Sequence, residues 1–251
     1  MMRHTTSNIQ ASYAFPVNGN PLLLFDMDGT LIIPRSDSDR KVTIHSLSFQ
    51  SRQQMRSIAH SYGVPSIELL NLDRMAHIWN RARSYGEANC FSEERMANLM
   101  AELNIPFSRQ EELEHFSSVL IPGTIEALEV LQKGTNILGM VTSASRAGYE
   151  RISHSVEFGC FWKYFEHSIT RDDCGYIKPN PEPINRILRL FKRSDFIYIG
   201  DSDHDAEAAK TAGGRFILLN TKQYDEKMLQ RMNPDGIVDR LNELPDVIYN
   251  Y

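Results

Sequence analysis

Two groups of aspartates follow apolar, strand-like runs of the sequence. Asp26 and Asp28 come directly after Leu22–Phe25. Asp201 and Asp205 follow a second run of the same kind. Ligand sites of open α/β sheets lie beyond the carboxyl ends of the strands, so the two groups would meet if their strands are neighbours. Carboxylates packed together are costly unless a cation neutralises them, and oxygen-only ligation suits Mg²⁺. Helix capping is the simpler alternative, because acidic side chains are also favourable at a helix N-terminus.

Two further segments could complete a site for phosphate. Thr142 and Ser143 end an apolar run at the start of a helical pattern, where hydroxyl groups and free backbone N–H groups bind anions. Either side chain could also cap that helix, and the two roles are compatible. Lys178 precedes Pro179, which restricts the lysine backbone towards extended geometry. A single lysine is most often a solvated surface charge, so Lys178 is weighed against that simpler interpretation.

These residues need a scaffold, and the sequence predicts one. Short apolar runs alternate with helix-period segments, which is typical of a parallel sheet covered by helices on both faces. The expected strands are Leu22–Phe25, Ile137–Val141, Phe165–Thr170, Phe196–Ile199 and Arg215–Leu219. The expected helices are Thr124–Gln132, Arg146–Glu157, Glu182–Phe191 and Ala206–Ala212, with a closing helix or two after Asp225. The pattern predicts an α/β fold with a Rossmann-like parallel sheet core.

One long stretch, from Leu31 to Leu120, breaks this alternation, because it shows helical patterns and almost no strand. Its expected helices are Phe49–Ser61, Ser66–Tyr85, Ser92–Leu103 and Arg109–Leu120, with a break at Asn104-Ile105-Pro106 and a capping box formed by Ser108 and Glu111. About ninety residues suffice for a small core of their own. We therefore expect an inserted all-helical cap domain at residues 34–120, and a catalytic core made of residues 21–33 and 121–251.

Composition narrows the class further. The 251 residues carry 27 basic and 32 acidic side chains, a formal net charge of −5, so a nucleic-acid surface is not expected. No apolar run is long enough for a membrane span. Cys90, Cys160 and Cys174 form no Cys-x-x-Cys pair, which favours reduced thiols in the cytoplasm. Residues 1–20 lack the apolar segment of a secretory signal and are expected to be a loose tail.

Four segments, taken in this order, resemble the motifs of the haloacid dehalogenase superfamily. They are Phe-Asp-Met-Asp-Gly-Thr-Leu from Phe25, Val-Thr-Ser from Val141, Lys-Pro-Asn-Pro-Glu-Pro from Lys178 and Gly-Asp-Ser-Asp-His-Asp from Gly200. Each segment alone is common, whereas the ordered set is specific and spans residues 21 to about 220. The resemblance implies phosphotransfer or hydrolysis on an α/β core.

The resemblance also implies a role for each charged residue. Asp26 would be the nucleophile that accepts the phosphoryl group as an aspartyl phosphate, and Asp28 would act first as general acid and then as general base. Mg²⁺ would be held by Asp26, by the backbone carbonyl of Asp28 and by Asp201. Asp205 would be an outer ligand or an orienting residue. Lys178 would neutralise charge on Asp26 and on the phosphoryl oxygens.

Three details of the motifs refine this interpretation. The second motif can be aligned in two registers, so that either Thr142 or Ser143 would bind phosphate. Asp28 favours phosphate chemistry, because the superfamily's dehalogenases lack this aspartate and its ATPase pumps carry threonine there. Only the interval from Asp26 to Thr142 has room for an inserted domain, whereas that from Ser143 to Lys178 has none. This placement resembles the helical cap of phosphoglycolate phosphatase and β-phosphoglucomutase.

The function expected from the resemblance is Mg²⁺-dependent hydrolysis of a small phosphorylated metabolite. A phosphomutase is the enzyme alternative, because Ser143-Ala144-Ser145-Arg146 is mutase-like. Ser38 stands where the β-phosphoglucomutases carry a histidine, which favours hydrolysis. A binding protein without turnover on the same fold is the third possibility.

Three side chains near these segments have two interpretations each. Arg81 and Arg83 lie where a cap could touch substrate, but a solvated helix surface around a buried Trp79 is favoured. His204 lies inside the second acidic group and is expected to face solvent rather than bind a ligand.

Overall fold

The computed structural model of the protein describes residues 21–35, 38–134 and 136–249, without the side chains of residues 38–46. The loose tail expected for residues 1–20 lies outside the described residues. None of the helices within these ranges combines the length and apolar character that crossing a membrane requires.

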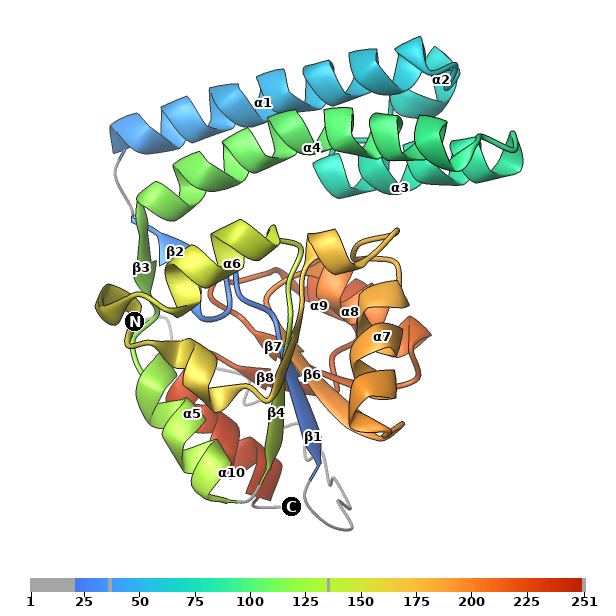
Figure 1. The fold of residues 1–251 in the computed structure, drawn as a ribbon. Coiled ribbons are helices and arrows are strands. Elements are labelled where there is room, and N and C mark those ends of the chain that lie inside the picture. The colour runs from blue at the N-terminus through green and yellow to red at the C-terminus, as the bar shows by residue number, and fades with distance from the viewer. Residues whose placement is uncertain (1–20, 36–37, 135, 250–251) are drawn as a thin grey trace.

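A six-stranded parallel sheet forms the centre of the protein (Figure 1). Its strands are β1 (Leu22–Phe25), β4 (Ile137–Val141), β5 (His167–Ile169), β6 (Phe196–Gly200), β7 (Arg215–Leu219) and β8 (Gly236–Val238). They follow the order β5-β4-β1-β6-β7-β8, so β1 lies inside the sheet and pairs with β4 and β6. A strand covered on both faces reads as a continuous apolar run, as β1 does. The two strands that lead into the aspartate groups are therefore neighbours.

Helices cover both faces of the sheet (Figure 1). Those on one face are α5 (Thr124–Lys133), α6 (Arg146–Ser153) and α10 (Leu244–Tyr249). Those on the other face are α7 (Glu182–Phe191), α8 (Asp203–Thr211) and α9 (Glu226–Met232). Successive strand residues point to opposite faces, so Leu23 and Phe25 pack in the first layer and Leu22 and Leu24 in the second. The predicted α/β fold with a Rossmann-like core is confirmed.

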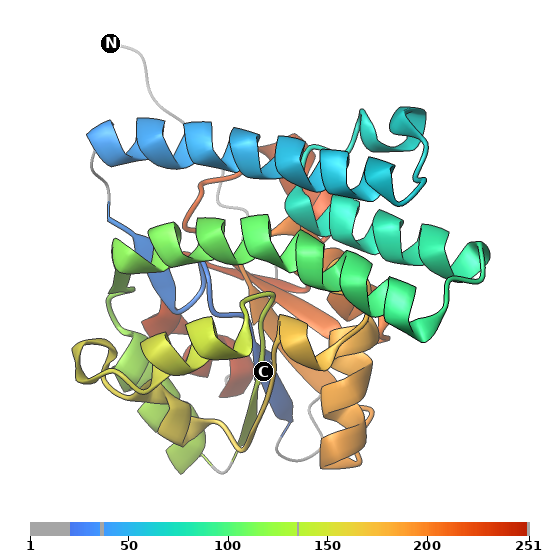
Figure 2. The same cartoon turned by 45° about the horizontal axis from the view of Figure 1, so that its top comes forward.

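A layer of helices lies across the carboxyl ends of the strands (Figures 1 and 2). Its helices are α1 (Ser38–Ser61), α2 (Ser66–Leu69), α3 (Met75–Ala88) and α4 (Glu93–Phe116). They enclose their own hydrophobic cluster, which includes Met55, Ile78, Trp79 and Leu99. Two short antiparallel strands, β2 (Ile32–Pro34) and β3 (Ser118–Leu120), pair where the chain enters and leaves this layer. We call α1–α4 the cap.

The expected helix boundaries in the cap were partly wrong. The break expected at Asn104-Ile105-Pro106 is absent from α4, which continues through a buried Pro106. Proline removes one helical hydrogen bond, but here the packing of the long helix against the rest of the cap outweighs that loss. The helix expected to reach Leu120 ends at Phe116, because the next residues pair with β2.

The single helix expected over Ser66–Tyr85 was also wrong, since α2 ends at Leu69 and α3 begins at Met75. The Arg56 guanidinium donates hydrogen bonds to the carbonyls of Leu69 and Leu72, at 3.1 and 2.7 Å, and so holds the turn between them. A long-range side-chain contact of this kind leaves no local sequence signal. At the start of the cap, α1 begins at Ser38 rather than at Phe49.

Smaller differences occur in the core. The helix expected to run to Glu157 ends at Ser153, and a short 3-10 turn follows. Helix α8 begins at Asp203 rather than Ala206, because the Ser202 hydroxyl caps its first turn. The closing segment after Asp225 contains the edge strand β8 in addition to its two helices.

Candidate active site

The carboxyl ends of β1 and β6 bring the two aspartate groups together. Phe25 of β1 is in register with Ile199 of β6, and the Asp26 N–H donates a hydrogen bond to the Ile199 carbonyl at 2.9 Å. One carboxylate oxygen from each of Asp26, Asp201 and Asp205 lies within 4.8 Å of the others. All three side chains are buried. The structure thus brings three of the four predicted aspartates together at one edge of the sheet.

Lys178 lies at the centre of this cluster. Its Nζ donates hydrogen bonds to Asp26 Oδ1 and Asp205 Oδ1, both at 2.6 Å, and to the Tyr198 hydroxyl at 2.9 Å. Burial acts to lower the pKa of Lys178, but the charges of Asp205 and Asp26 hold that pKa well above its usual range. The side chain is therefore a fixed, buried positive charge and not a solvated surface lysine.

The carboxyl groups differ in their electrostatic surroundings. Burial raises the pKa of Asp26 well above its usual range, against the attraction of Lys178. Burial likewise raises the pKa of Asp201, although Asp201 Oδ2 lies 2.6 Å from Lys222 Nζ. Burial also acts against the charged form of Asp205, yet the ion pair with Lys178 lowers its pKa. Carboxyl groups with raised pKa values gain the most from a nearby cation.

Asp205 is held in the first turn of α8. Its Oδ2 accepts hydrogen bonds from the Ser202 N–H at 3.1 Å and from the Ser202 hydroxyl at 2.5 Å, which forms a capping box at the start of α8. Its Oδ1 accepts from Lys178. With both oxygens engaged in this way, the geometry fits an orienting role for Asp205.

A glycine makes room for the approach of the two aspartate groups. Gly29 has φ +89°, a left-handed conformation that side chains disfavour. A Cβ atom at this position would collide with the Asp201 carboxylate. The turn after β1 can therefore pass close to β6 only if it carries glycine.

The donor set fits a small, hard cation. Asp26, Asp201 and Asp205 supply only carboxylate oxygens, all buried and all within reach of one point. Oxygen ligands of this kind, completed by water, suit Mg²⁺ better than metals that prefer sulfur or imidazole. A bound cation would also offset the burial cost that raises the pKa of Asp26 and Asp201.

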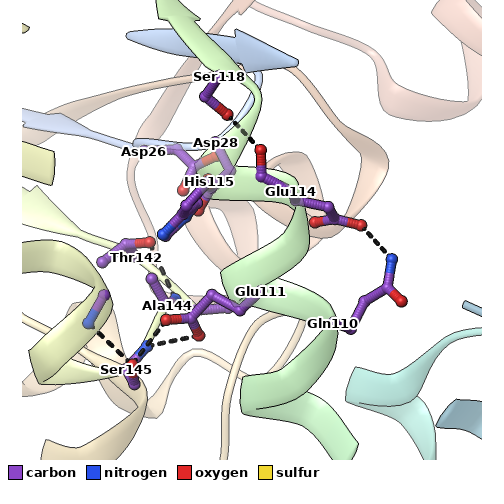
Figure 3. A network of polar contacts seen from close by, with 12 residues as sticks. Asp26, Asp28, Gln110, Glu111, Glu114, His115, Ser118, Thr142, Ala144 and Ser145 are labelled. Carbon is purple, nitrogen blue, oxygen red and sulfur yellow. Dashed lines mark hydrogen bonds and ion pairs between the residues drawn. The ribbon is translucent and has the colours of Figure 1, made fainter. Parts of the chain in front are cut away.

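Asp28 faces the cap rather than the buried cluster. Its side chain is 43% exposed, and its Oδ1 forms a hydrogen bond with Nε2 of His115 at 2.9 Å (Figure 3). His115 lies near the end of α4 and is itself buried. Burial acts to lower the pKa of His115, but the hydrogen bond to Asp28 raises it above its usual range. No sequence pattern indicates His115, because only the tertiary fold brings it beside Asp28.

The two candidate phosphate-binding hydroxyls have different surroundings. Thr142 is buried, and its Oγ1 accepts a hydrogen bond from the Ala144 N–H at 3.0 Å (Figure 3). Ser143 is half-buried, and its carbonyl accepts a hydrogen bond from Arg171 at 2.6 Å. Both follow β4 at the same edge of the sheet as Asp26. The two registers of the motif therefore both remain compatible with the geometry.

Glu111 joins the cap to two core segments, by hydrogen bonds to the segment after β4 and by a buried ion pair to the segment after β5. Glu111 of α4 accepts hydrogen bonds from the Ser145 N–H at 2.9 Å and from its hydroxyl at 2.6 Å (Figure 3). Arg171, on the segment after β5, donates to Glu111 at 2.9 Å and to Ser108 at 3.0 Å. The expected capping box of Ser108 and Glu111 was wrong: both lie inside α4, where they bind Arg171.

The structure also shows the surroundings of Arg81, Arg83 and His204. Arg81 and Arg83 pair with Glu68 and Glu87 on the cap, which agrees with the helix-surface interpretation. His204 is partly buried and packs against the His77 ring at 4.7 Å between centroids, so the expectation that it faces solvent was wrong.

Fold and site together define an α/β protein with a helical cap and an acidic site at the carboxyl edge of its parallel sheet. The sequence model of the haloacid dehalogenase-like hydrolase family matches residues 23–219. The chain belongs to this family, as the four motifs predicted.

Known proteins resemble the chain along most of its length. The pyrophosphatase PpaX of Bacillus mycoides is 22% identical over 229 residues, which is 90% of this chain and 95% of that protein. The structure of a predicted phosphoglycolate phosphatase from Haemophilus somnus matches with a TM-score of 0.55 at 21% identity, over 91% of this chain and 98% of that chain. A 2-haloacid dehalogenase from Pseudomonas syringae matches with a TM-score of 0.54 at 23% identity, over 92% and 99%. The shared fold thus hosts more than one chemistry.

Proposed function

We propose that the protein is a Mg²⁺-dependent phosphatase that hydrolyses a small phosphorylated metabolite through an aspartyl-phosphate intermediate. The observation that carries the proposal is the meeting of Asp26 with Lys178 and Asp201 at the sheet edge, with a second carboxylate, Asp28, two residues further on. In this proposal Asp26 is the nucleophile and Asp28 the acid–base group. Lys178 supplies a fixed positive charge, and Asp26 and Asp201 supply oxygen ligands for the cation.

Each of two steps uses groups of this chain. In the first, an Asp26 carboxylate oxygen attacks phosphorus, the bond to the leaving oxygen breaks, and Asp28 supplies the proton that this oxygen takes up. In the second, Asp28 removes a proton from a water molecule, which attacks phosphorus and releases phosphate from Asp26. The fold alone does not distinguish this chemistry from dehalogenation, because a 2-haloacid dehalogenase has a similar fold. The second aspartate, Asp28, favours phosphate transfer.

The surrounding residues stabilise the charge that the transfer moves. Lys178 stays beside the phosphoryl oxygens and Asp26, because two carboxylates hold its ammonium group at 2.6 Å. Thr142 or Ser143, just before α6, would bind the phosphoryl group. Mg²⁺, held by Asp26, Asp201 and the Asp28 carbonyl, would supply further positive charge.

The substrate class is a phosphate ester or anhydride of small size. The names of the relatives suggest pyrophosphate and phosphoglycolate as the first compounds to test. We further propose a cytoplasmic location, which the three free cysteines Cys90, Cys160 and Cys174 support. No nucleic-acid or membrane partner is proposed.

The test is phosphate release from a panel of phosphorylated metabolites, pyrophosphate included, with Mg²⁺ and with a chelator. We expect release from one substrate class, its loss on chelation, and its loss in Asp26→Asn. Asp195→Asn is the matched control, because Asp195 is exposed and pairs with Arg193. Thermal unfolding of both variants checks that the substitution leaves the fold intact.

Two other results would replace the proposal. A phosphomutase would convert one sugar phosphate into another, require a bisphosphate activator and release little phosphate. A binding protein would show no turnover in the unsubstituted chain, and Asp26→Asn would have nothing to remove. Mass spectrometry of the intact protein with substrate separates these cases, because only the two enzymes form a phosphorylated Asp26.

A further inference from the structure

The segment that carries Lys178 is attached to the cap. Ile177, the residue before Lys178, is completely buried in the hydrophobic cluster of the cap. The Trp79 Nε1–H of α3 donates a hydrogen bond to the Gly175 carbonyl at 3.0 Å. The Tyr176 hydroxyl donates to Glu87 of α3 at 2.5 Å. A core segment next to a candidate catalytic lysine is thus bound by one cap helix.

Among these contacts between α3 and the segment before Lys178, those of Asn80 lie closest to Lys178 along the chain. Its Nδ2 donates a hydrogen bond to the Ile177 carbonyl at 2.7 Å, and its Oδ1 accepts one from the Ile177 N–H at 2.9 Å. One side-chain amide therefore satisfies both backbone polar groups of the residue that precedes Lys178. Such a pair fixes the orientation of that peptide as well as its position, because each bond is directional.

The segment before Lys178 also passes close to the cap at Gly175. A Cβ atom on Gly175 would lie 2.5 Å from Nε of Arg83 on the same cap helix. On the other side of Ile177, the Lys178 ammonium is confined between Asp26 and Asp205. The lysine is thus fixed at both ends, with its backbone held by the cap and its charge held by the core.

We propose that Asn80 is a positioning residue through which the cap places Lys178 for catalysis. The proposal rests on the proposed function of the site. It follows that docking of the cap and assembly of the charged cluster are one event, since the peptide before Lys178 is held by Asn80. Two other polar contacts of cap and core, Arg74 with Asp203 and Glu111 with Arg171, do not involve the peptide before Lys178.

The first experiment compares Asn80→Ala with Asn89→Ala. Asn89 lies at the end of the same helix, is exposed, and donates to the Tyr85 carbonyl only within the cap. A misplacement of about 1 Å can cost about 10²-fold in rate, so we expect Asn80→Ala to lower kcat by up to that factor with little change in KM. Asn89→Ala should retain the kcat of the unsubstituted enzyme.

A second measurement needs no turnover. Lys178 has a side chain only 5% exposed, so an amine-acetylating reagent should label it slowly, whereas Lys133 on α5, 79% exposed, provides an internal reference outside the charged cluster. We expect Asn80→Ala to increase Lys178 labelling several-fold relative to Lys133, as measured by mass spectrometry of peptides. The isosteric variant Asn80→Asp keeps the acceptor for the Ile177 N–H and should give a smaller increase.

The outcomes separate the two proposals. Unchanged labelling of Lys178 in both Asn80 variants would overturn the positioning role, whatever the activity. A fall in kcat with unchanged labelling would also overturn it, because Asn80 would then act on something other than Lys178. If the unsubstituted chain releases no phosphate, the labelling still decides whether Asn80 controls Lys178, and only the proposed function fails.

Discussion

The charges of individual residues explain why a bound cation would stabilise this site. Three buried carboxylates, Asp26, Asp201 and Asp205, are compensated by two ammonium groups, Lys178 and Lys222. One negative charge is left over, and a phosphate group would add more. Like charges in a buried site are costly, so a divalent cation is the simplest way to let the phosphate enter.

We expect His115 to orient the side chain of Asp28. The carboxylate of Asp28 is half-exposed and has His115 as its hydrogen-bond partner, so His115→Ala should leave Asp28 free to adopt other rotamers. The expected result is a fall in kcat of about tenfold, a fraction of the 10²–10⁴-fold that general acid–base catalysis contributes. Steady-state kinetics on the substrate found in the panel measure it.

Two variants control this prediction. His115→Gln retains an N–H donor at a similar reach and should recover part of the lost kcat. His154→Ala removes an exposed histidine that stacks on Trp162 and should leave kcat unchanged. An equal loss in the Ala and Gln variants would show that His115 supports packing and does not orient Asp28.

Some residues of the site could be predicted from the sequence and others could not. The residues that local motifs predicted are Asp26, Asp28, Thr142, Ser143, Lys178, Asp201 and Asp205. Those found only in the structure are Asn80, Glu111, His115, Arg171 and Lys222. Apart from Lys178, the first group follows closely after strands, so its position is set locally. Lys178 was recognisable from its motif, although its backbone is held by the cap. The second group comes from distant segments and acts as single residues, which no spacing rule connects.

Among the elements, helix α4 shows how tertiary contacts override local signals. Asn104, Ser108 and Glu111 share one face of the helix, and all three accept hydrogen bonds from Arg171. The local pattern of Pro106 and a Ser-x-x-Glu sequence predicted a break and a new start. The single helix is instead stabilised by burial along its length and by this shared partner. The short strands β2, β3 and β8 were too brief to give a periodic signal.

We expect the Arg171 contact to be important for stability. The Arg171 side chain is fully buried and the Glu111 side chain is 7% exposed, so Arg171→Met would leave a buried carboxylate without its cation. Removing one partner of a buried ion pair costs about 3–5 kcal/mol, which should appear as a lower free energy of unfolding in urea. Circular dichroism during the titration measures it.

An exposed pair on another helix provides the comparison. Arg186 and Glu182 form an ion pair on α7 with 44% of the Arg186 side chain exposed, so Arg186→Met should cost at most about 1 kcal/mol. Adding Glu111→Gln to Arg171→Met should recover part of the loss, since the unpaired charge is then removed. Equal losses in the two arginine variants would contradict the assigned importance of the buried contact.

Across the whole molecule, the cap and core share structure at several places. Ile177 of the core segment completes the cap cluster, while Glu111 and His115 of the cap contact residues after β4 and β1. The division into a cap at residues 34–120 and a core made of the rest stays a prediction. The helical cap was predictable because its sequence has helical periodicity and almost no strand pattern. The contacts that attach the cap to the core were not predictable, because they join residues far apart in the sequence.

We therefore expect cap and core to unfold together. The chain has two tryptophans, and Trp79 is buried in the cap whereas Trp162 lies in the core with 45% exposure. In Trp162→Phe, fluorescence reports the cap alone, while far-ultraviolet circular dichroism reports all helices and strands. Coincident urea transitions of the two signals would show one cooperative unit.

Ile177→Ala in the Trp162→Phe background tests the physical reason for this coupling. Truncating a fully buried isoleucine costs about 2–5 kcal/mol, and here the cavity opens where a core segment enters the cap cluster. We expect the fluorescence transition to move to lower urea than the circular dichroism transition, because the cap then loses its apolar attachment. Ile184→Ala, on the buried face of α7 in the core, should shift both signals together. If Trp79 already unfolds first in the Trp162→Phe protein, the cap is an independent unit and Ile177 does not couple it to the core.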